Sequence, residues 1–250
     1  MGDILFTLPT DLTSLVLSKW ICLQDLARLD NANCNRHQRE ILGTLFNSAE
    51  FILKSSPKHS LSRDFTYWIN NRGIRVENFV FSKDVSLRTS RTYMSKFGQH
   101  IRSIQVKQVE NVARFIEITK QVSQFCEHLK MFVGDQTNCT ESLLEVLRCC
   151  PELCDLRMED CTDKSDPHFD LIDFDGLLYS NLRTICLDGV NVDIITWNIF
   201  QVNFAPALER LRLSSWKPAL QKIIDAGPFD SLRSLDVSQS TIPSELFAKM

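Results

Sequence analysis

The chain has 250 residues, of which 44% are hydrophobic and 24% are charged, as in ordinary soluble globular proteins of one large or two small domains. This composition excludes a mainly disordered, collagen-like or low-complexity chain. The 28 Lys and Arg residues face 31 Asp and Glu residues, for a net charge of −3, which disfavours a nucleic-acid-binding domain because such domains need a basic excess. Only eight residues are glycine, and neither GxGxxG nor GxxxxGK[ST] occurs, so we expect no phosphate-binding loop and no cofactor.

The beginning of the chain predicts neither a targeting signal nor a membrane segment. Asp11 interrupts the first apolar stretch, and Phe6 stands where the myristoylation pattern needs Ser or Thr. The longest uncharged run, residues 194–208, contains polar side chains and is shorter than the roughly 18 apolar residues of a membrane span. We therefore expect an intracellular, soluble protein of the cytoplasm or nucleus that has no membrane partner.

Residues 1–46 are expected to form a small domain of three short helices. The first starts near Thr7, and the other two fit residues 23–29 and 32–46. Three helices of this size have a thin core and leave apolar surface for a docking patch. The alternative is that this bundle only caps the repeats that follow. The apolar side chains and the proline that open the first helix are Leu8, Pro9, Leu12, Leu15 and Val16.

Residues 47–72 are expected to join this bundle to the rest of the chain. Residues 55–62 are Ser-rich and polar, which indicates a loop. A helix over 63–71 follows, with Phe65, Trp68 and Ile69 on one face, and Gly73 stands where a helix ends.

Residues 73–250 carry an internal repeat of the form Leu-x-x-Leu-x-Leu, with other apolar residues allowed at the Leu positions. Successive units begin 24 to 29 residues apart, which is the spacing of leucine-rich repeats. The first positions of the seven units are Val76, Ile101, Leu129, Leu153, Leu182, Leu208 and Leu232. In the third unit, Gly134 stands where the last apolar residue belongs.

This repeat predicts an α/β fold. The second and third apolar positions of each unit are two residues apart, as a strand with one buried face requires. Amphipathic segments of helical period, such as 142–148 and 218–224, lie between units. Stacking of such units gives a leucine-rich-repeat solenoid with a curved parallel sheet inside and helices outside. The seventh unit is expected to be incomplete, because the sequence stops soon after its strand.

Two resemblances extend this interpretation. The placement of Cys126, Cys150 and Cys161 around the repeat resembles the cysteine-containing class of leucine-rich repeat, which implies that these thiols are buried apolar fillers. The run Leu8-Pro9-Thr10-Asp11, followed by Asp25-Leu26 and Cys34, resembles the F-box. An F-box-like bundle followed by such repeats is similar to the architecture of F-box/leucine-rich-repeat proteins.

The resemblance implies that the chain is an adaptor and not an enzyme. In that family the F-box docks on the Skp-type adaptor of a cullin–RING (SCF-type) ubiquitin ligase, and the repeats hold a protein substrate. By position, the residues that would contact the adaptor are Leu8, Pro9, Leu12, Leu15 and Val16.

Other chemistries are less well supported. A zinc site could use Cys149, Cys150, Cys154 and Cys161, joined by His168, but the chain contains no CxxC pair. The acidic stretch 163–175 lacks the glycine and closing glutamate of a calcium loop. No histidine stands in a known catalytic motif. We therefore expect no metal site and no catalytic residues.

Function is then expected on the concave face of the repeats, where residues that flank the buried strand positions point. Mixed charge on this face favours a protein partner over nucleic acid. The alternative is a leucine-rich-repeat scaffold unrelated to ubiquitin. The candidate substrate-binding residues are Lys107, Asp135, Asp155, Arg157, Glu159, Asp188, Arg210 and Arg212.

Overall fold

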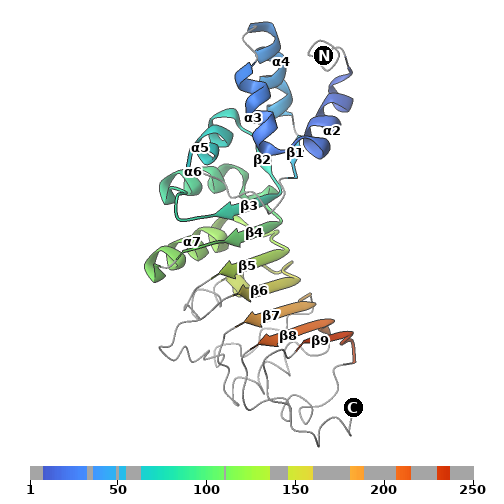
Figure 1. The fold of residues 1–250 in the computed structure, drawn as a ribbon, viewed down its shortest axis with the longest axis vertical. Helices are drawn as coiled ribbons and strands as arrows, with labels where there is room; N and C mark the ends of the chain where they lie inside the picture. Colours follow the sequence, from blue (N-terminus) through green and yellow to red (C-terminus); the bar gives the residue numbers. More distant parts are fainter. Residues whose placement is uncertain are drawn as a thin grey trace, which may run out of the picture. The chain divides into compact units, whose positions relative to one another are not determined.

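The chain is an α/β protein in which helices accompany a seven-stranded parallel sheet (Figure 1). A computed structural model describes residues 8–32, 36–48, 51–54, 63–109, 111–135, 146–159, 181–188, 207–214 and 230–236. The strands lie in the sheet in their chain order, which is β3 (Asn78–Phe81), β4 (Ser103–Val106), β5 (Met131–Asp135), β6 (Asp155–Glu159), β7 (Thr184–Asp188), β8 (Arg210–Ser214) and β9 (Ser234–Asp236). Each of these strands contains the second apolar position of one predicted unit, as the two-residue spacing indicated.

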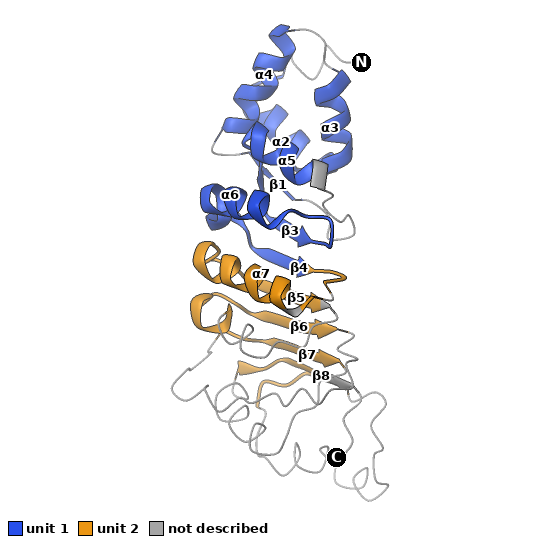
Figure 2. Ribbon diagram, turned by 90° about the vertical axis from the view of Figure 1, so that its left-hand side faces the viewer, with its two compact units in different colours: residues 1–105 blue, residues 106–250 orange. Residues whose placement is uncertain are grey.

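The chain divides into two compact units, residues 1–105 and residues 106–250 (Figure 2). The domain boundaries expected from the sequence, at residues 46 and 72, stay predictions. The expected helices over 142–148 and 218–224 fall largely or wholly outside the described residues, as do the Ser-rich loop 55–62 and the acidic stretch 163–175.

The first unit begins with three helices, as the apolar periodicity predicted: α2 (Thr10–Trp20), α3 (Leu23–Ala32) and α4 (Arg36–Asn47). Leu26 of α3 and Leu42, Leu45 and Phe46 of α4 are buried, with at most 1% of each side chain exposed. The expected start of the third helix at residue 32 is wrong, because Ala32 ends α3 and α4 begins only at Arg36.

The joining helix α5 (Arg63–Arg72) is tied to α3 by a buried carboxylate. Asp30 is 3% exposed, and its Oδ2 accepts hydrogen bonds from Trp68 Nε1 and Arg72 Nε, both at 2.9 Å. A buried charge is tolerated when it is paired and hydrogen-bonded in this way. The helix ends as predicted at Gly73, whose φ of +67° is the left-handed conformation of a helix stop. A Cβ there would also lie 2.7 Å from Asn47 Oδ1.

A two-stranded parallel sheet, β1 (Ile52–Leu53) with β2 (Arg75–Val76), was not predicted from the sequence. It is held by a buried tyrosine of α6 (Leu87–Phe97). The Tyr93 hydroxyl donates to the Ile74 carbonyl at 2.9 Å and accepts from the Val76 amide at 3.0 Å. The Tyr93 ring also stacks on Phe79 of β3 at 5.4 Å between centroids, so one side chain joins α6 to both sheets.

In the second unit, the neighbouring strands from β5 to β9 pair in parallel. The pairing places equivalent repeat positions side by side, so that Leu156, Ile185, Leu211 and Leu235 form one row across the sheet. Helix α7 (Val112–Phe125) covers this buried side through Phe115, whose ring lies edge-on to Phe132 of β5 at 6.3 Å.

Gly134 departs from the repeat because its neighbour fills the space. Gly134 of β5 pairs with Met158 of β6. A Cβ at residue 134 would lie 3.0 Å from Met158 Sδ and 3.2 Å from Met158 Cε. The Met158 thioether of one repeat therefore occupies the volume that an apolar side chain at position 134 would take in the preceding repeat.

Candidate functional site

Helix α2 presents its apolar side to solvent. Leu12 and Leu15 are 50% and 45% exposed, and Leu8, just before the helix, is 38% exposed. Pro9 is exposed as well, and Val16 is half-buried. These five positions are the ones that the resemblance to the F-box assigns to adaptor binding, and none of them is fully buried.

Trp20, which the sequence analysis did not select, extends this surface and is 83% exposed. At about 100° per residue, Leu12, Leu15, Val16 and Trp20 fall within about 140° of one face of the helix. The sequence could have predicted this, because Trp20 follows Leu12 and Val16 at intervals of eight and four residues, which place all three on one face of a helix. We call Leu8, Leu12, Leu15, Val16 and Trp20 the α2 stripe.

The buried side of α2 is mostly polar. Thr13, Ser14, Leu17 and Ser18 are each at most 9% exposed. Two of the hydroxyls donate within their own helix, Thr13 Oγ1 to the Pro9 carbonyl at 3.2 Å and Ser18 Oγ to the Leu15 carbonyl at 3.3 Å. Such local hydrogen bonds remove most of the cost of burying a hydroxyl. The helix contacts β1, and its buried side can be largely polar while its apolar side stays outward.

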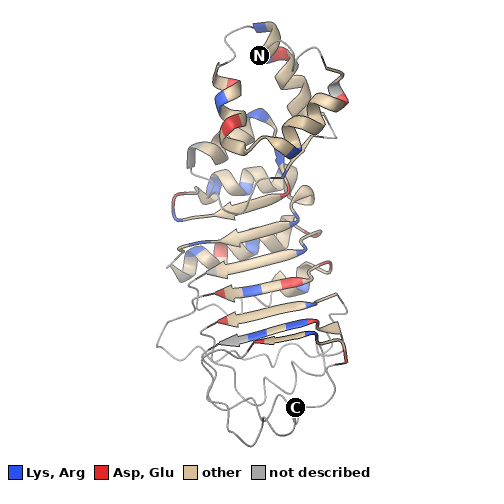
Figure 3. Ribbon diagram, turned by 45° about the vertical axis from the view of Figure 1, so that its right-hand side comes forward, with Lys and Arg blue, Asp and Glu red and all other residues tan. Residues whose placement is uncertain are grey.

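A second surface lies in the unit of residues 106–250, on the face of the sheet opposite buried Leu156 and Met158. Charged residues of both signs lie along strands β6 and β8 (Figure 3). The strand register forms two rows of neighbours across β6 to β9. The first row is Asp155, Thr184, Arg210 and Ser234. The second row is Arg157, Cys186, Arg212 and Asp236.

The arginines of these rows differ in how far they are neutralised. Arg157 is bound by both oxygens of Asp155, with Nε to Oδ1 at 2.9 Å and Nη2 to Oδ2 at 2.7 Å. The hydrogen bond with Asp155 raises the pKa of Arg157, so this charge is permanent and paired. Arg212 lies 3.3 Å from Asp236, with about half of each side chain exposed. Arg210 is exposed and makes no ion pair with any described residue.

A small cavity opens on this face between β6 and β9, with a volume of about 190 Å³. Its lining includes all three arginines, and the buried thiol of Cys186 also contributes to it. Burial raises the pKa of Cys186, so the thiol is neutral. The volume is below the roughly 300 Å³ at which pockets for cofactors and drug-sized ligands begin. The cavity therefore suits a single protruding side chain better than a small molecule.

The remaining predicted residues lie at the carboxyl ends of the strands. Asp135, Glu159 and Asp188 are the last residues of β5, β6 and β7, and Asp135 pairs with Glu159. Lys107 follows β4 directly and is half-buried. The register thus brings together seven of the eight predicted sheet-face residues on β5 to β8, whereas Lys107 belongs to an earlier repeat.

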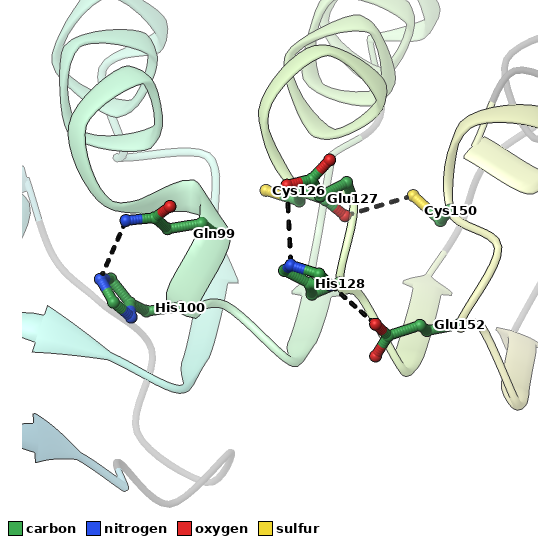
Figure 4. A network of polar contacts seen from close by, with 7 residues as sticks. All are labelled: Gln99, His100, Cys126, Glu127, His128, Cys150 and Glu152. Carbon is green, nitrogen blue, oxygen red and sulfur yellow. Dashed lines mark hydrogen bonds and ion pairs between the residues drawn. The ribbon is translucent and has the colours of Figure 1, made fainter.

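Cys150 and His128 make contacts between successive repeats (Figure 4). Cys150 Sγ donates to the Cys126 carbonyl at 3.5 Å, and burial raises the pKa of Cys150 to about 12. His128 Nδ1 lies 2.7 Å from Glu152 Oε1, a contact that the sequence analysis missed. The interval of 24 residues equals the repeat interval between Leu129 and Leu153, so the pair joins equivalent positions of two units.

Neither a metal site nor a membrane span is found among the described residues. No group of three or more His, Cys, Asp or Glu side chains there could hold a metal ion, and the proposed zinc ligands Cys161 and His168 lie outside these residues. In the same part of the chain, no helix has both the length and the apolar character that crossing a bilayer requires. Comparison of the sequence with family models and with curated proteins found no match.

Proposed function

We propose that this protein is a non-catalytic substrate-recognition adaptor of an SCF-type ubiquitin ligase. In this proposal, residues 1–46 form an F-box-like domain that docks on the Skp-type adaptor, and the repeats form a leucine-rich-repeat solenoid whose concave face binds a protein substrate. The observation that carries the proposal is the exposed α2 stripe, because its members Leu8, Leu12 and Leu15 stand at the motif positions and remain open to solvent.

The strand spacing supports the solenoid part of the proposal. Strands that start 24 to 29 residues apart and pair in parallel with equivalent positions aligned are what stacked leucine-rich repeats require. The charged face on β6 to β9 supports a protein substrate. Its close mixture of both signs is suited to a polar protein surface, whereas a phosphate backbone would need a basic face.

The packing of α2 favours docking over the alternative that the helices only cap the repeats. A cap would bury Leu8 and Leu12 against the first repeat, but these side chains are 38% and 50% exposed. An apolar stripe of this kind on a surface helix is typical of a protein–protein contact.

Co-purification with a Skp-type adaptor tests the proposal. The full chain is co-expressed with the adaptor, and we expect Leu12→Asp and Leu15→Asp each to lower the recovered complex at least tenfold without changing far-UV circular dichroism. Tyr67→Asp is the matched control, because Tyr67 is another exposed apolar side chain, 62% exposed, on α5. Failure of the unaltered chain to bind the adaptor would leave the scaffold unrelated to ubiquitin as the better interpretation.

A further inference from the structure

We propose that the cavity between β6 and β9 recognises a single acidic side chain, Asp or Glu, on an extended segment of a protein partner. This inference deepens the proposed function, since it assigns a chemical class to the substrate. It depends only on the sheet face and not on whether the partner is ubiquitinated.

The arginines of the cavity differ in the positive charge that they leave for a ligand. Arg157 is already held by both oxygens of Asp155 and has little affinity to offer a second carboxylate. Arg210 makes no ion pair with a described residue, and Arg212 makes one exposed pair at 3.3 Å, of a kind that contributes little stability. The available positive charge of the cavity is therefore on β8.

The spacing of the two β8 arginines suits a single carboxylate. Arg210 and Arg212 are two residues apart on one strand, so both point to the same face with Cα atoms about 7 Å apart. Two guanidinium groups at this spacing can both reach one carboxylate, and charge-assisted hydrogen bonds of this type are roughly twice as strong as neutral ones. The hydroxyls of Thr184 and Ser234, which flank Arg210 in the register, add donors at the same point.

The rest of the cavity suits the remainder of one acidic side chain. The buried thiol of Cys186 lies between Arg157 and Arg212 in its row and, being neutral, gives an apolar patch for the methylene part of the side chain. The volume of about 190 Å³ leaves room for one side chain. Carboxylates of Glu159 and Asp236 line the cavity beside the arginines, which leaves little net positive charge for more than one acidic residue. The ligand is thus an isolated acidic residue and not a polyacidic tract.

Selection from a displayed library of random linear peptides on the immobilised full chain tests this inference. We expect the peptides enriched on the unaltered chain to carry Asp or Glu at one position without a run of acidic residues. Arg210→Glu is expected to lose these peptides at least tenfold and to select Lys or Arg at the same position. Arg210→Gln, which removes the charge with less perturbation, should lose them as well.

Arg233→Glu is the matched control, because Arg233 is exposed in the same unit but does not line the cavity. It should retain the peptides. Enriched peptides without an acidic preference, no enrichment at all, or equal loss with Arg233→Glu would overturn the inference. So would binding that appears only when the acidic residue is replaced by phosphoserine. Recovery of the Skp-type adaptor is measured on the same variants, so that failure of adaptor docking is seen separately from failure of peptide recognition.

Discussion

Replacing Asp30 by alanine should destabilise the first unit by an amount that its two hydrogen bonds set. The carboxylate accepts from the neutral indole of Trp68 and from the charged guanidinium of Arg72. A neutral hydrogen bond contributes about 1 kcal/mol and a charged one about 1.5–3 kcal/mol. Arg72 is 42% exposed, so water can solvate its guanidinium after the change. The charged hydrogen bond should therefore contribute near the lower end of its range. The expected loss for Asp30→Ala is about 2–3 kcal/mol.

Urea unfolding of the full chain, followed by far-UV circular dichroism, measures this loss. Asp30→Asn should lose about half as much stability. The amide oxygen can still accept a hydrogen bond from Trp68, but the negative charge that pairs with Arg72 is gone. Glu40→Gln is the control, since Glu40 pairs with Arg36 only at an exposed site and should change stability by less than about 0.5 kcal/mol. If Asp30→Ala has no larger effect than Glu40→Gln, the buried carboxylate does not tie α3 to α5 and the reasoning is wrong.

Three further predictions concern buried groups. Tyr93→Phe leaves two buried main-chain groups unpaired and should cost about 1–3 kcal/mol in urea unfolding, whereas Tyr67→Phe, at an exposed position, should be neutral. Gly134→Leu should be destabilising alone but milder in a Met158→Ala background, which a double-mutant cycle would show; an equal loss in both backgrounds would contradict the shared-volume explanation. For Cys150, burial raises the pKa to about 12 from 9.0, so both states keep the proton below pH 9, and from pH 9 to 12 only the unfolded state ionises. The unfolding free energy should fall there by about 1.4 kcal/mol per pH unit more than in Cys150→Ala. Urea unfolding of both proteins at successive pH values measures this difference, and the same pH dependence in both would contradict the prediction.

The strands were predictable because the repeat imposes one local pattern seven times. Each copy except the third gives two apolar positions two residues apart, and the period of 24 to 29 residues predicts which residues pair between neighbours. The β1–β2 pair could not be predicted in this way, since it consists of two residues in each strand and belongs to no repeat. The only signal was the apolar run Phe51-Ile52-Leu53. The glycine at position 134 could not be explained from the sequence either, because the side chain that fills its space, Met158, comes from the next repeat.

The candidate sites were predictable as positions but not as interactions. Strand alternation alone placed Arg157, Arg210 and Arg212 on one face. Which of them is neutralised depends on side-chain geometry, and the bidentate pair of Arg157 with Asp155 two residues earlier could not be inferred from spacing. The His128–Glu152 contact could have been found, because residues one repeat apart are neighbours in a stack.

The orientation of α2 departs from ordinary patterning, which would bury the apolar side of a helix. Full burial of a large aliphatic side chain is worth about 1.5–3 kcal/mol, and Leu12 and Leu15 keep about half of their surface in water. Several kcal/mol of apolar burial, including that of Trp20, is therefore not used by the described part of the chain. The self-satisfied hydroxyls of Thr13 and Ser18 make this orientation possible at low cost. A partner that covers the α2 stripe would gain that burial without rearranging the helix, which is the physical basis for expecting a pre-formed docking surface.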